Sequence, residues 1–294
     1  NVGPVTFYVA GNSVDNPFSD VADAGDHVYT NKYVLTAAAE TCSLSTPVIT
    51  SVISASGFGA LNTFAPGSWL EVYGTNLAPD TRPWGGSDFN GANAPTALDG
   101  VSVSIGGKPG FVYYIANSQI NSQINVQAPA GTATGPAAVT VTNCAGTSAP
   151  YVINEAKFAP GVLAPPSFNI GGKQYMVAVR SCNPACTYIG KPDQPAKPGD
   201  TIVAYGIGFG DVTPSSPPGI VVGPTELNRL ANPLTILFGQ TPAAAPAYFG
   251  LAPNFVGLYQ FNITVPDVPD GDVPVTFEVG GVQTTQTMYV TVHR

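Results

Sequence analysis

A short pattern of glutamine, asparagine and proline occurs twice in this chain and constrains its fold more than any other feature. The two occurrences are Gln123, Asn125 and Pro129 in SQINVQAP, and Gln260, Asn262 and Pro266 in YQFNITVP. Two further pairs of segments match in the same order: APGSWLEVYGTNL (65–77) with KPGDTIVAYGIGF (197–209), and VSVSIGGKP (101–109) with LTILFGQTP (234–242). Matches that keep their order along the chain indicate an internal duplication. The sequence therefore predicts two copies of one structural unit.

Apolar and polar residues alternate through both copies of this pattern. In the first copy the predicted core face is Ile124, Val126 and Ala128, and the predicted polar face is Gln123, Asn125 and Gln127. A period of two is that of a half-buried strand. Proline ends each segment because it lacks the N–H that a strand ladder needs. Short strands separated by turn signals predict an all-β fold of two tandem immunoglobulin-like antiparallel β-sandwiches.

The length and composition agree with this fold class. A chain of 294 residues is long enough for two domains, and 33 Gly and 29 Pro with only 10% charged residues favour strands joined by turns. We expect an N-terminal β-hairpin or donor-strand segment at 1–40, a first sandwich at 41–156 and a second sandwich at 157–294. Within the second, Gly171-Gly172 predicts the turn of an additional hairpin.

The charge balance limits the partners. A net charge of −8 with ten Lys and Arg leaves no basic stripe to neutralise phosphates, so we expect neither nucleic acid nor an anionic membrane surface as a partner. The sequence has no run of about 18 apolar residues, and its first residues do not form a signal peptide. We expect an extracellular or cell-surface protein whose signal peptide has been removed.

Four cysteines, an even number, are compatible with disulfides in an oxidising compartment. Of the three connectivities we favour Cys42 with Cys144 and Cys182 with Cys186, since the second pair would close a tight Asn-Pro-Ala turn. A zinc site is disfavoured because a single C-x3-C without a nearby His does not match tetrahedral ligand spacing. Unpaired buried thiols are the alternative.

Several motifs resemble one known family when they are taken together and in order. They are PGSWLEVYGTNLAPDTRPW, GVSVSIGGKPGFVYYI, SQINVQAP, GTSAPY, KPGDTIVAYGIGFG and LYQFNITVPDVPDGD. The chain from about residue 45 to 294 resembles the paired immunoglobulin-like modules, related to TIG/IPT domains, that close many secreted acidobacterial proteins. This resemblance implies the fold and an extracytoplasmic setting, and it implies no activity. The doubled SQINSQIN at 118–125 departs from the family and leaves the register of that strand open.

The first forty residues belong to neither copy. GPVTFYVAGN (3–12) and DHVYTNKYVLTAA (26–38) predict two strands joined by an acidic loop, and VTFYVAGN with DAGDHVYT resembles the closing hairpin of reeler-like secreted domains. A lone two-stranded ribbon is marginal in water, so it must dock on its own chain or on another subunit. Docking on the sheet edge of a neighbour, repeated head to tail, would form a filament. The predicted interface residues are Val5, Phe7, Val9, Val28 and Tyr33.

We find no motif that predicts catalysis, and we expect a protein that is not an enzyme. The two histidines, His27 and His293, suggest no Ser-His-Asp arrangement. The glycines Gly206, Gly208 and Gly210 follow a strand but open no helix, so they predict a turn rather than a phosphate site. We expect no cofactor; the alternative is calcium held by the carboxylates of the acidic loop, Asp15, Asp20, Asp23 and Asp26.

The predicted function is that of a secreted, non-enzymatic structural protein, a subunit of an extracellular filament that assembles into a homopolymer by docking of its N-terminal strand. The alternative is a polysaccharide- or surface-binding accessory module of a larger secreted protein. In that alternative, Trp84 and Phe89 contact the ligand from a long loop. Trp69 shares a strand face with Glu71 and Tyr73, and all these aromatic side chains would otherwise pack between domains.

Overall fold

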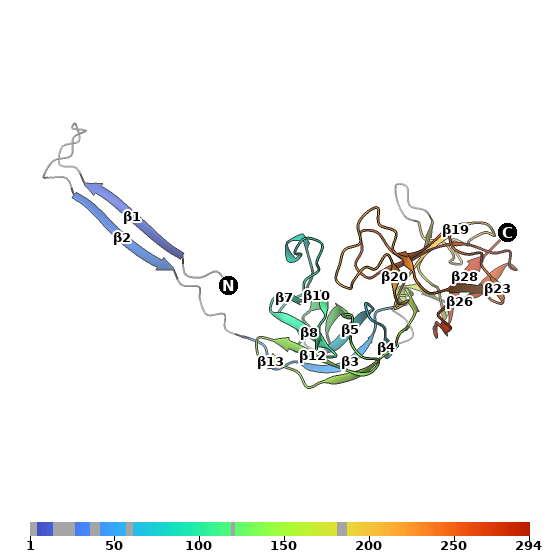
Figure 1. Cartoon of the computed structure of the whole chain (residues 1–294), viewed down its shortest axis with the longest axis horizontal. Helices are drawn as coiled ribbons and strands as arrows, with labels where there is room; N and C mark the ends of the chain where they lie inside the picture. The colour runs from blue at the N-terminus through green and yellow to red at the C-terminus, as the bar shows by residue number, and fades with distance from the viewer. Residues whose placement is uncertain (1–4, 14–26, 36–41, 57–60, 119–120, 181–186) are drawn as a thin grey trace, which may run out of the picture. The chain divides into compact units, whose positions relative to one another are not determined.

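The structure is a computed structural model that describes the chain except for residues 1–4, 14–26, 36–41, 57–60, 119–120 and 181–186 (Figure 1). The described residues are all-β, apart from two 3₁₀ turns at Gly86–Asp88 and Pro166–Phe168. They contain no helix long and apolar enough to cross a membrane. The contacts divide the chain into two compact units, Asn1–Cys42 and Ser43–Arg294.

The first unit is the predicted hairpin. Strands β1 (Val5–Ser13) and β2 (His27–Leu35) pair antiparallel without a bulge, from Val5 opposite Leu35 to Ser13 opposite His27. They form a two-stranded sheet. The acidic loop that joins them lies outside the described residues, and so do the four carboxylates of the predicted calcium site.

The second unit begins with a pair of sheets that contain the first repeat. The five-stranded sheet runs in the order β3 (Val48–Ser54), β5 (Trp69–Thr75), β11 (Ser122–Gln127), β10 (Phe111–Ala116), β6 (Arg82–Pro83). The path of the other sheet is β4 (Thr63–Phe64), β14 (Tyr151–Glu155), β12 (Gly135–Asn143), β8 (Val101–Ile105), β7 (Ala97–Leu98); β13 (Gly146–Thr147) pairs with β12, and β9 (Lys108–Pro109) with β8. Buried residues from both sheets, among them Val72, Ile124, Val103 and Val139, form one hydrophobic core.

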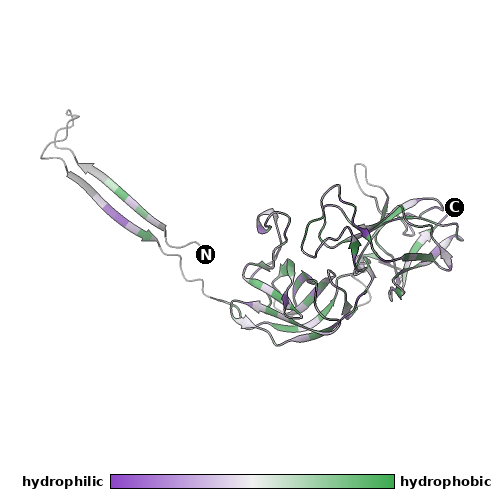
Figure 2. Ribbon diagram, viewed as in Figure 1, coloured by the Kyte–Doolittle hydropathy of each residue, from purple (hydrophilic) through white to green (hydrophobic). Residues whose placement is uncertain are grey.

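The second repeat forms an equivalent pair of sheets with a core of its own. One sheet follows β15 (Gly161–Val162), β19 (Thr201–Ile207), β25 (Tyr259–Thr264), β24 (Tyr248–Leu251), β21 (Arg229–Leu230), β20 (Val212–Thr213), with β18 (Ala178–Arg180) beside β19. The other follows β23 (Thr241–Pro242), β22 (Leu234–Phe238), β26 (Gly271–Val279), β27 (Val282–Gln283), with β28 (Met288–Val292) also paired with β26. Figure 2 shows hydrophobic and hydrophilic residues alternating along the strands of this unit, as a half-buried strand requires.

The duplicated pattern occupies equivalent places in the two sandwiches. Gln123 lies opposite Tyr73 of β5, and Gln260 lies opposite Tyr205 of β19. In each copy the glutamine amide donates to the asparagine two residues later, over 2.7 Å at Asn125 and 2.9 Å at Asn262. The predicted fold class, two tandem antiparallel β-sandwiches preceded by a hairpin, is confirmed. The second SQIN of the doubled segment supplies β11.

The predicted additional hairpin is present. Strands β16 (Asn169–Ile170) and β17 (Lys173–Gln174) pair antiparallel around Gly171 and Gly172, which have positive φ angles of 58° and 82°. Glycine adopts this conformation without the strain that a Cβ would add. Immediately after β17, Tyr175 forms a parallel bridge to Tyr289 of β28, so this segment packs on the second sandwich as expected.

One predicted position is wrong. Gln127 was expected on the polar face of its strand with Gln123 and Asn125, but its side chain is only 1% exposed. It accepts a hydrogen bond from the N–H of Gly219 (2.7 Å) and donates one to the carbonyl of Gly67 (3.0 Å). Gln127 still pairs with Trp69 and Phe111, so its side chain keeps the expected face, but residues of the second repeat cover that face here. The amide therefore joins the two repeats.

Candidate functional site

Aromatic side chains from both repeats line a groove of about 570 Å³ in the second unit. Trp69, Trp84, Phe89 and Tyr113 belong to the first repeat, and Phe255 belongs to the second. The remaining lining residues are Ala55, Asn125, Leu163, Ile207, Val221, Asn254, Val256 and Leu258. The groove therefore combines aromatic and aliphatic walls with two asparagines, a composition that binding sites for small molecules and chain segments share.

An arginine holds the loop that carries Trp84 and Phe89. The guanidinium of Arg82 donates to both carboxylate oxygens of Asp88, at 2.8 and 3.1 Å, and to both of Asp99, at 2.5 and 2.8 Å. Asp88 also accepts from the N–H of Gly85 at 2.6 Å. Hydrogen bonds from Arg82 lower the pKa of the Asp88 and Asp99 carboxyls. Two bidentate contacts of this kind fix the direction as well as the position of a loop.

The rings of the groove pack edge to face. Trp84 lies 4.8 Å from Phe89 and 5.0 Å from Tyr113, and Trp69 lies 5.7 Å from Trp84, measured between ring centroids. The indole N–H of Trp69 donates to the carbonyl of Val256 at 2.9 Å, so this ring is locked between the two repeats. Edge-to-face contacts stabilise the rings by about 0.5–1.5 kcal/mol per pair beyond their burial. The aromatic wall is therefore preorganised.

Several hydrogen-bonding groups along this wall remain free. Within the part of the chain that the structure describes, the indole N–H of Trp84, the hydroxyl of Tyr113, the side-chain nitrogen of Asn125 and the side chain of Asn254 form no hydrogen bond. Two rings are also open to solvent, since Tyr113 is 39% exposed and Phe255 is 52% exposed. The groove therefore offers ring surfaces and polar donors together.

A polar strip continues the same sheet face away from the groove. Its residues are Glu71 and Tyr73 of β5 and Gln123 of β11. Gln123 lies opposite Tyr73, and Asn125 lies opposite Glu71. The Tyr73 hydroxyl donates to Glu71 at 2.6 Å, and burial together with this carboxylate raises the pKa of Tyr73. The tyrosine therefore stays protonated and keeps its hydroxyl as a donor.

The structure brings together the two residues that the sequence predicts to contact a ligand, Trp84 and Phe89. Sequence reasoning missed Tyr113 and Phe255. Tyr113 lies at a register shift between Val112 and Tyr114, where the strand alternation is interrupted. Phe255 follows Asn254, whose φ angle is +68°. An asparagine with positive φ marks a turn, but no sequence signal showed that this turn would face the first repeat.

The predicted interface residues of the hairpin are described in part. Phe7, Val9 and Tyr33 are 50%, 54% and 54% exposed, and Tyr8 and Val34 are 78% and 49% exposed. The side chains of Val5 and Val28 lie outside the described residues. The hairpin thus presents apolar and aromatic side chains to solvent along both strands.

The predicted disulfides are described only in part as well. Cys42 and Cys144 are both disulfide-bonded, and the described chain has no free cysteine. Cys182 and Cys186 lie in a segment that is not described, so the connectivity stays a prediction. The described residues contain no cluster of three or more His, Cys, Asp or Glu side chains that could hold a metal ion.

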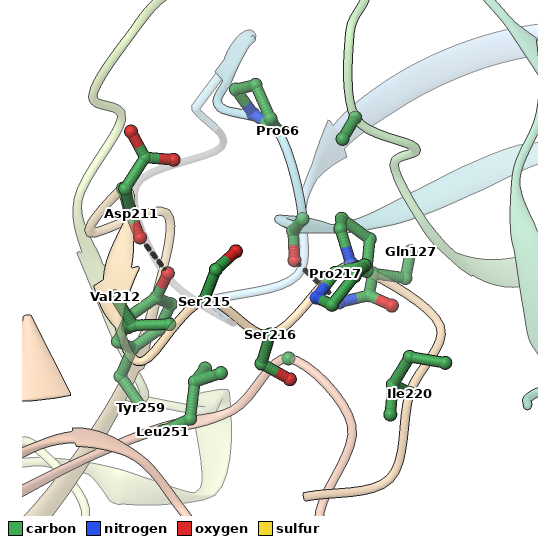
Figure 3. Close-up of a pocket in the computed structure, with 15 residues that line it drawn as sticks. Pro66, Gln127, Asp211, Val212, Ser215, Ser216, Pro217, Ile220, Leu251 and Tyr259 are labelled. Carbon is green, nitrogen blue, oxygen red and sulfur yellow. Dashed lines mark hydrogen bonds between the residues drawn. The ribbon is translucent and has the colours of Figure 1, made fainter. Parts of the chain in front are cut away.

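A second, smaller hollow of about 280 Å³ lies where the loop after β20 meets the first repeat (Figure 3). Ser215, Ser216 and Pro217 line it from the loop, and Gln127 and Pro66 line it from the first repeat. Both polar atoms of the Gln127 amide are hydrogen-bonded, and the Tyr259 hydroxyl donates to the carbonyl of Gly210. This hollow therefore forms where the two repeats meet.

Comparisons with known proteins assign no family to this chain, since no family model and no curated protein matches it. It is similar to a Bacteroides ovatus mixed-linkage glucan utilization locus protein, SGBP-B, solved with a mixed-linkage heptasaccharide (14% identity, 99% of this chain, 53% of that chain, TM-score 0.35). It is also similar to SGBP-B from a Bacteroides uniformis complex xyloglucan utilization locus (15% identity, 84% of this chain, 49% of that chain, TM-score 0.25). Domains 5–6 of the S-layer protein SbsC match 84% of this chain over 98% of their own length, at 14% identity and TM-score 0.25. The chain spans about half the length of both SGBP-B proteins, and similarities at these TM-scores carry no argument about its function.

Proposed function

We propose that this chain is a non-catalytic protein of the cell exterior that binds polysaccharide in its aromatic groove. The observation that carries the proposal is the convergence of Trp84, Phe89, Tyr113 and Phe255 with unused hydrogen-bond donors in a groove open to solvent. Sugar rings have apolar faces that pack on aromatic rings, and hydroxyls around their edges that need polar partners. The groove offers both.

The disulfide bonds at Cys42 and Cys144 support the proposed location, because disulfides persist in oxidising environments such as the cell exterior. The low charge of the chain supports a neutral ligand, since ten Lys and Arg offer little attraction for polyanions. A neutral polysaccharide is the ligand class that these features favour.

Affinity electrophoresis in gels that contain mixed-linkage glucan, xyloglucan or cellulose derivatives tests the proposal. We expect retardation by at least one neutral glucan, and at least about fivefold weaker retention for Phe255→Ala, which removes a half-exposed ring without opening the core. Tyr188→Ala is the matched control, since Tyr188 is 49% exposed and lies outside the groove. Equal migration of the wild type in all gels would contradict the proposal. Unchanged polysaccharide length after incubation would support a role without catalysis.

A second candidate is the predicted structural role, in which the chain is a subunit of an extracellular fibre. The exposed apolar side chains of the hairpin favour it, because an isolated two-stranded ribbon that leaves such groups in water is marginally stable. Negative-stain images of concentrated protein, with and without residues 1–40, distinguish the two candidates. Fibres that require these residues support the structural role, and single particles in both samples contradict it.

A further inference from the structure

The hairpin has two edges of different character. β1 (VTFYVAGNS) contains no charged residue, whereas β2 (HVYTNKYVL) carries Lys32 and begins with His27. Lysine on an edge strand opposes pairing with a further strand, because its charge would have to be desolvated. The two strands pair only with each other among the described residues. The outer edge of β1 is therefore the one suited to accept another strand.

Among the described strands of the second unit, β3 is the outer strand that best matches this edge; β14 is covered by β4 only at Asn154 and Glu155, but it carries Glu155. At the ends of the larger sheets of this unit, β4, β6, β7, β15, β20, β23 and β27 are each two residues long. β28 is longer, but bridges from Tyr175 and Ala196 cover its outer side. β3 has seven residues, VITSVIS, and contains neither a charged residue nor a proline.

The outer edge of β3 is not paired with another strand in the described chain, although at its end the N–H of Ser54 donates to the carbonyl of Leu61 at 2.8 Å. β3 pairs with β5 on its inner side, and its only irregularity is a register shift between Ile49 and Ser51. Val48, at its beginning, is 53% exposed. Natural sheets shorten, charge or bulge their outer strands to prevent further pairing; β3 has one register shift, at Thr50, but it is seven residues long and carries no charge. Such an edge is a site for strand addition.

We propose that β1 of one copy of this chain pairs with β3 of a second copy, which joins the two-stranded hairpin to the five-stranded sheet. The pairing would satisfy backbone groups of both edges and cover apolar side chains around Phe7 and Val48. This interface lies outside the aromatic groove, so it does not depend on glycan binding.

The chain connection favours a second copy over the same copy. Residues 36–47 join β2, not β1, to β3, so β2 is the strand that would follow naturally beside β3 within one chain. Bringing β1 there would require this connection to cross over β1. A second copy has no such constraint, and each subunit carries both a donor edge and an acceptor edge. The association is head to tail and extends into a filament when it does not close into a ring.

Three threonine-to-lysine substitutions test the pairing in the full-length chain. Thr6→Lys charges β1, Thr50→Lys charges β3, and Thr30→Lys charges β2 and is the matched control. All three side chains are exposed, and Thr6 and Thr30 lie on the same face of the hairpin, opposite Val34 and Ala10. In sedimentation velocity over a concentration series, we expect association of the wild type and of Thr30→Lys, and at least tenfold weaker association of Thr6→Lys and Thr50→Lys. Far-ultraviolet circular dichroism verifies that each variant is folded.

Other outcomes overturn the proposal. A wild type that sediments as a monomer at every concentration would contradict it. Association that Thr30→Lys weakens as much as Thr6→Lys does would also contradict it, because a different surface of the hairpin would then mediate the contact. An equimolar mixture of Thr6→Cys and Thr50→Cys chains provides a second measurement, and it should form a crosslinked dimer that neither variant forms alone. A crosslink that forms within the Thr6→Cys/Thr50→Cys double variant while the wild type remains monomeric would show that β1 docks on its own chain.

Discussion

The indole N–H of Trp69 donates to the carbonyl oxygen of Val256 over 2.9 Å, although the two residues belong to different repeats. Trp69 begins β5 in the first sandwich, and Val256 lies in the loop between β24 and β25 of the second. Val256 is buried, so its carbonyl has little access to water. This contact fixes one of the tryptophans that line the aromatic groove and joins the repeats at the same place.

Replacing Trp69 by phenylalanine should therefore destabilise the second unit more than the same change at Trp84. Trp69→Phe leaves the Val256 carbonyl without its partner, which costs about 1–3 kcal/mol in addition to the lost ring area. The Trp84 indole N–H has no partner in the described chain, so Trp84→Phe costs ring area alone. Urea unfolding of both variants measures the difference. Equal losses would show that the hydrogen bond to Val256 contributes nothing to stability.

Gln127 is a second contact between the repeats, and we expect its removal to be costly. Gln127→Leu leaves the N–H of Gly219 and the carbonyl of Gly67 unsatisfied, so the free energy of unfolding should fall by about 2–4 kcal/mol. Gln123→Leu is the control, because Gln123 is half-buried and bonds only to Asn125. Thermal unfolding followed by circular dichroism compares them. A smaller effect at Gln127 than at Gln123 would contradict this account.

Gly257 packs directly against the same amide. It has a φ angle of +61°, and a Cβ at this position would collide with the side-chain nitrogen of Gln127. A residue other than glycine would be strained there and would displace the amide. The same contact thus explains why the loop after β24 needs glycine at this position.

The loop that carries Trp84 should lose stability in acid. The pKa values of Asp88 and Asp99 lie below the ordinary value of 3.8 because both carboxylates accept hydrogen bonds from Arg82. A lowered pKa contributes stability that is fully present above 3.8 and is lost as the pH falls through the folded-state value. Asp80 has the opposite effect on stability in acid, since burial and the charge of Asp99 raise its pKa and its protonation favours the folded state.

Arg82→Gln tests this pH dependence. The wild type should be more stable than the variant at neutral pH, and the difference should shrink as the pH falls below 3.8, because protonated Asp88 and Asp99 no longer favour a cation. Urea unfolding between pH 2 and 7 measures both proteins under identical conditions. A difference that stays constant over this range would show that the two carboxylates do not titrate against Arg82.

The two tryptophans of the chain both line the groove, so intrinsic fluorescence reports on it directly. If a neutral polysaccharide binds there, as proposed, titration with it should shift the emission of the wild type and of Trp69→Phe. The shift should be lost or strongly reduced in Trp84→Phe, because Trp84 lies among Phe89 and Tyr113 and its N–H is free. A full shift in Trp84→Phe would place the ligand elsewhere.

The sequence predicts the sandwiches well because a duplicated pattern shows each strand twice. Gln123 with Asn125, and Gln260 with Asn262, lie on half-buried positions as the alternation requires. The groove was predictable only through Trp84 and Phe89. Its other wall comes from Phe255, on a loop whose direction depends on contacts between the repeats, and no local pattern encodes those contacts. The prediction for Gln127 was wrong for the same reason.

Disulfide connectivity is the remaining prediction that chemistry can test directly. Non-reducing digestion and mass spectrometry should yield one peptide that joins Cys42 to Cys144, and one that holds Cys182 with Cys186. A bridge between Cys42 and Cys144 closes a loop of about 100 residues, which restricts the unfolded chain and stabilises the folded one by roughly 4–5 kcal/mol on the chain-entropy model. The paired substitution Cys42→Ser/Cys144→Ser should lower the unfolding free energy by that order, whereas Cys182→Ser/Cys186→Ser should cost less because its loop is short. A peptide that joins Cys42 or Cys144 to either cysteine of the other pair would refute this connectivity.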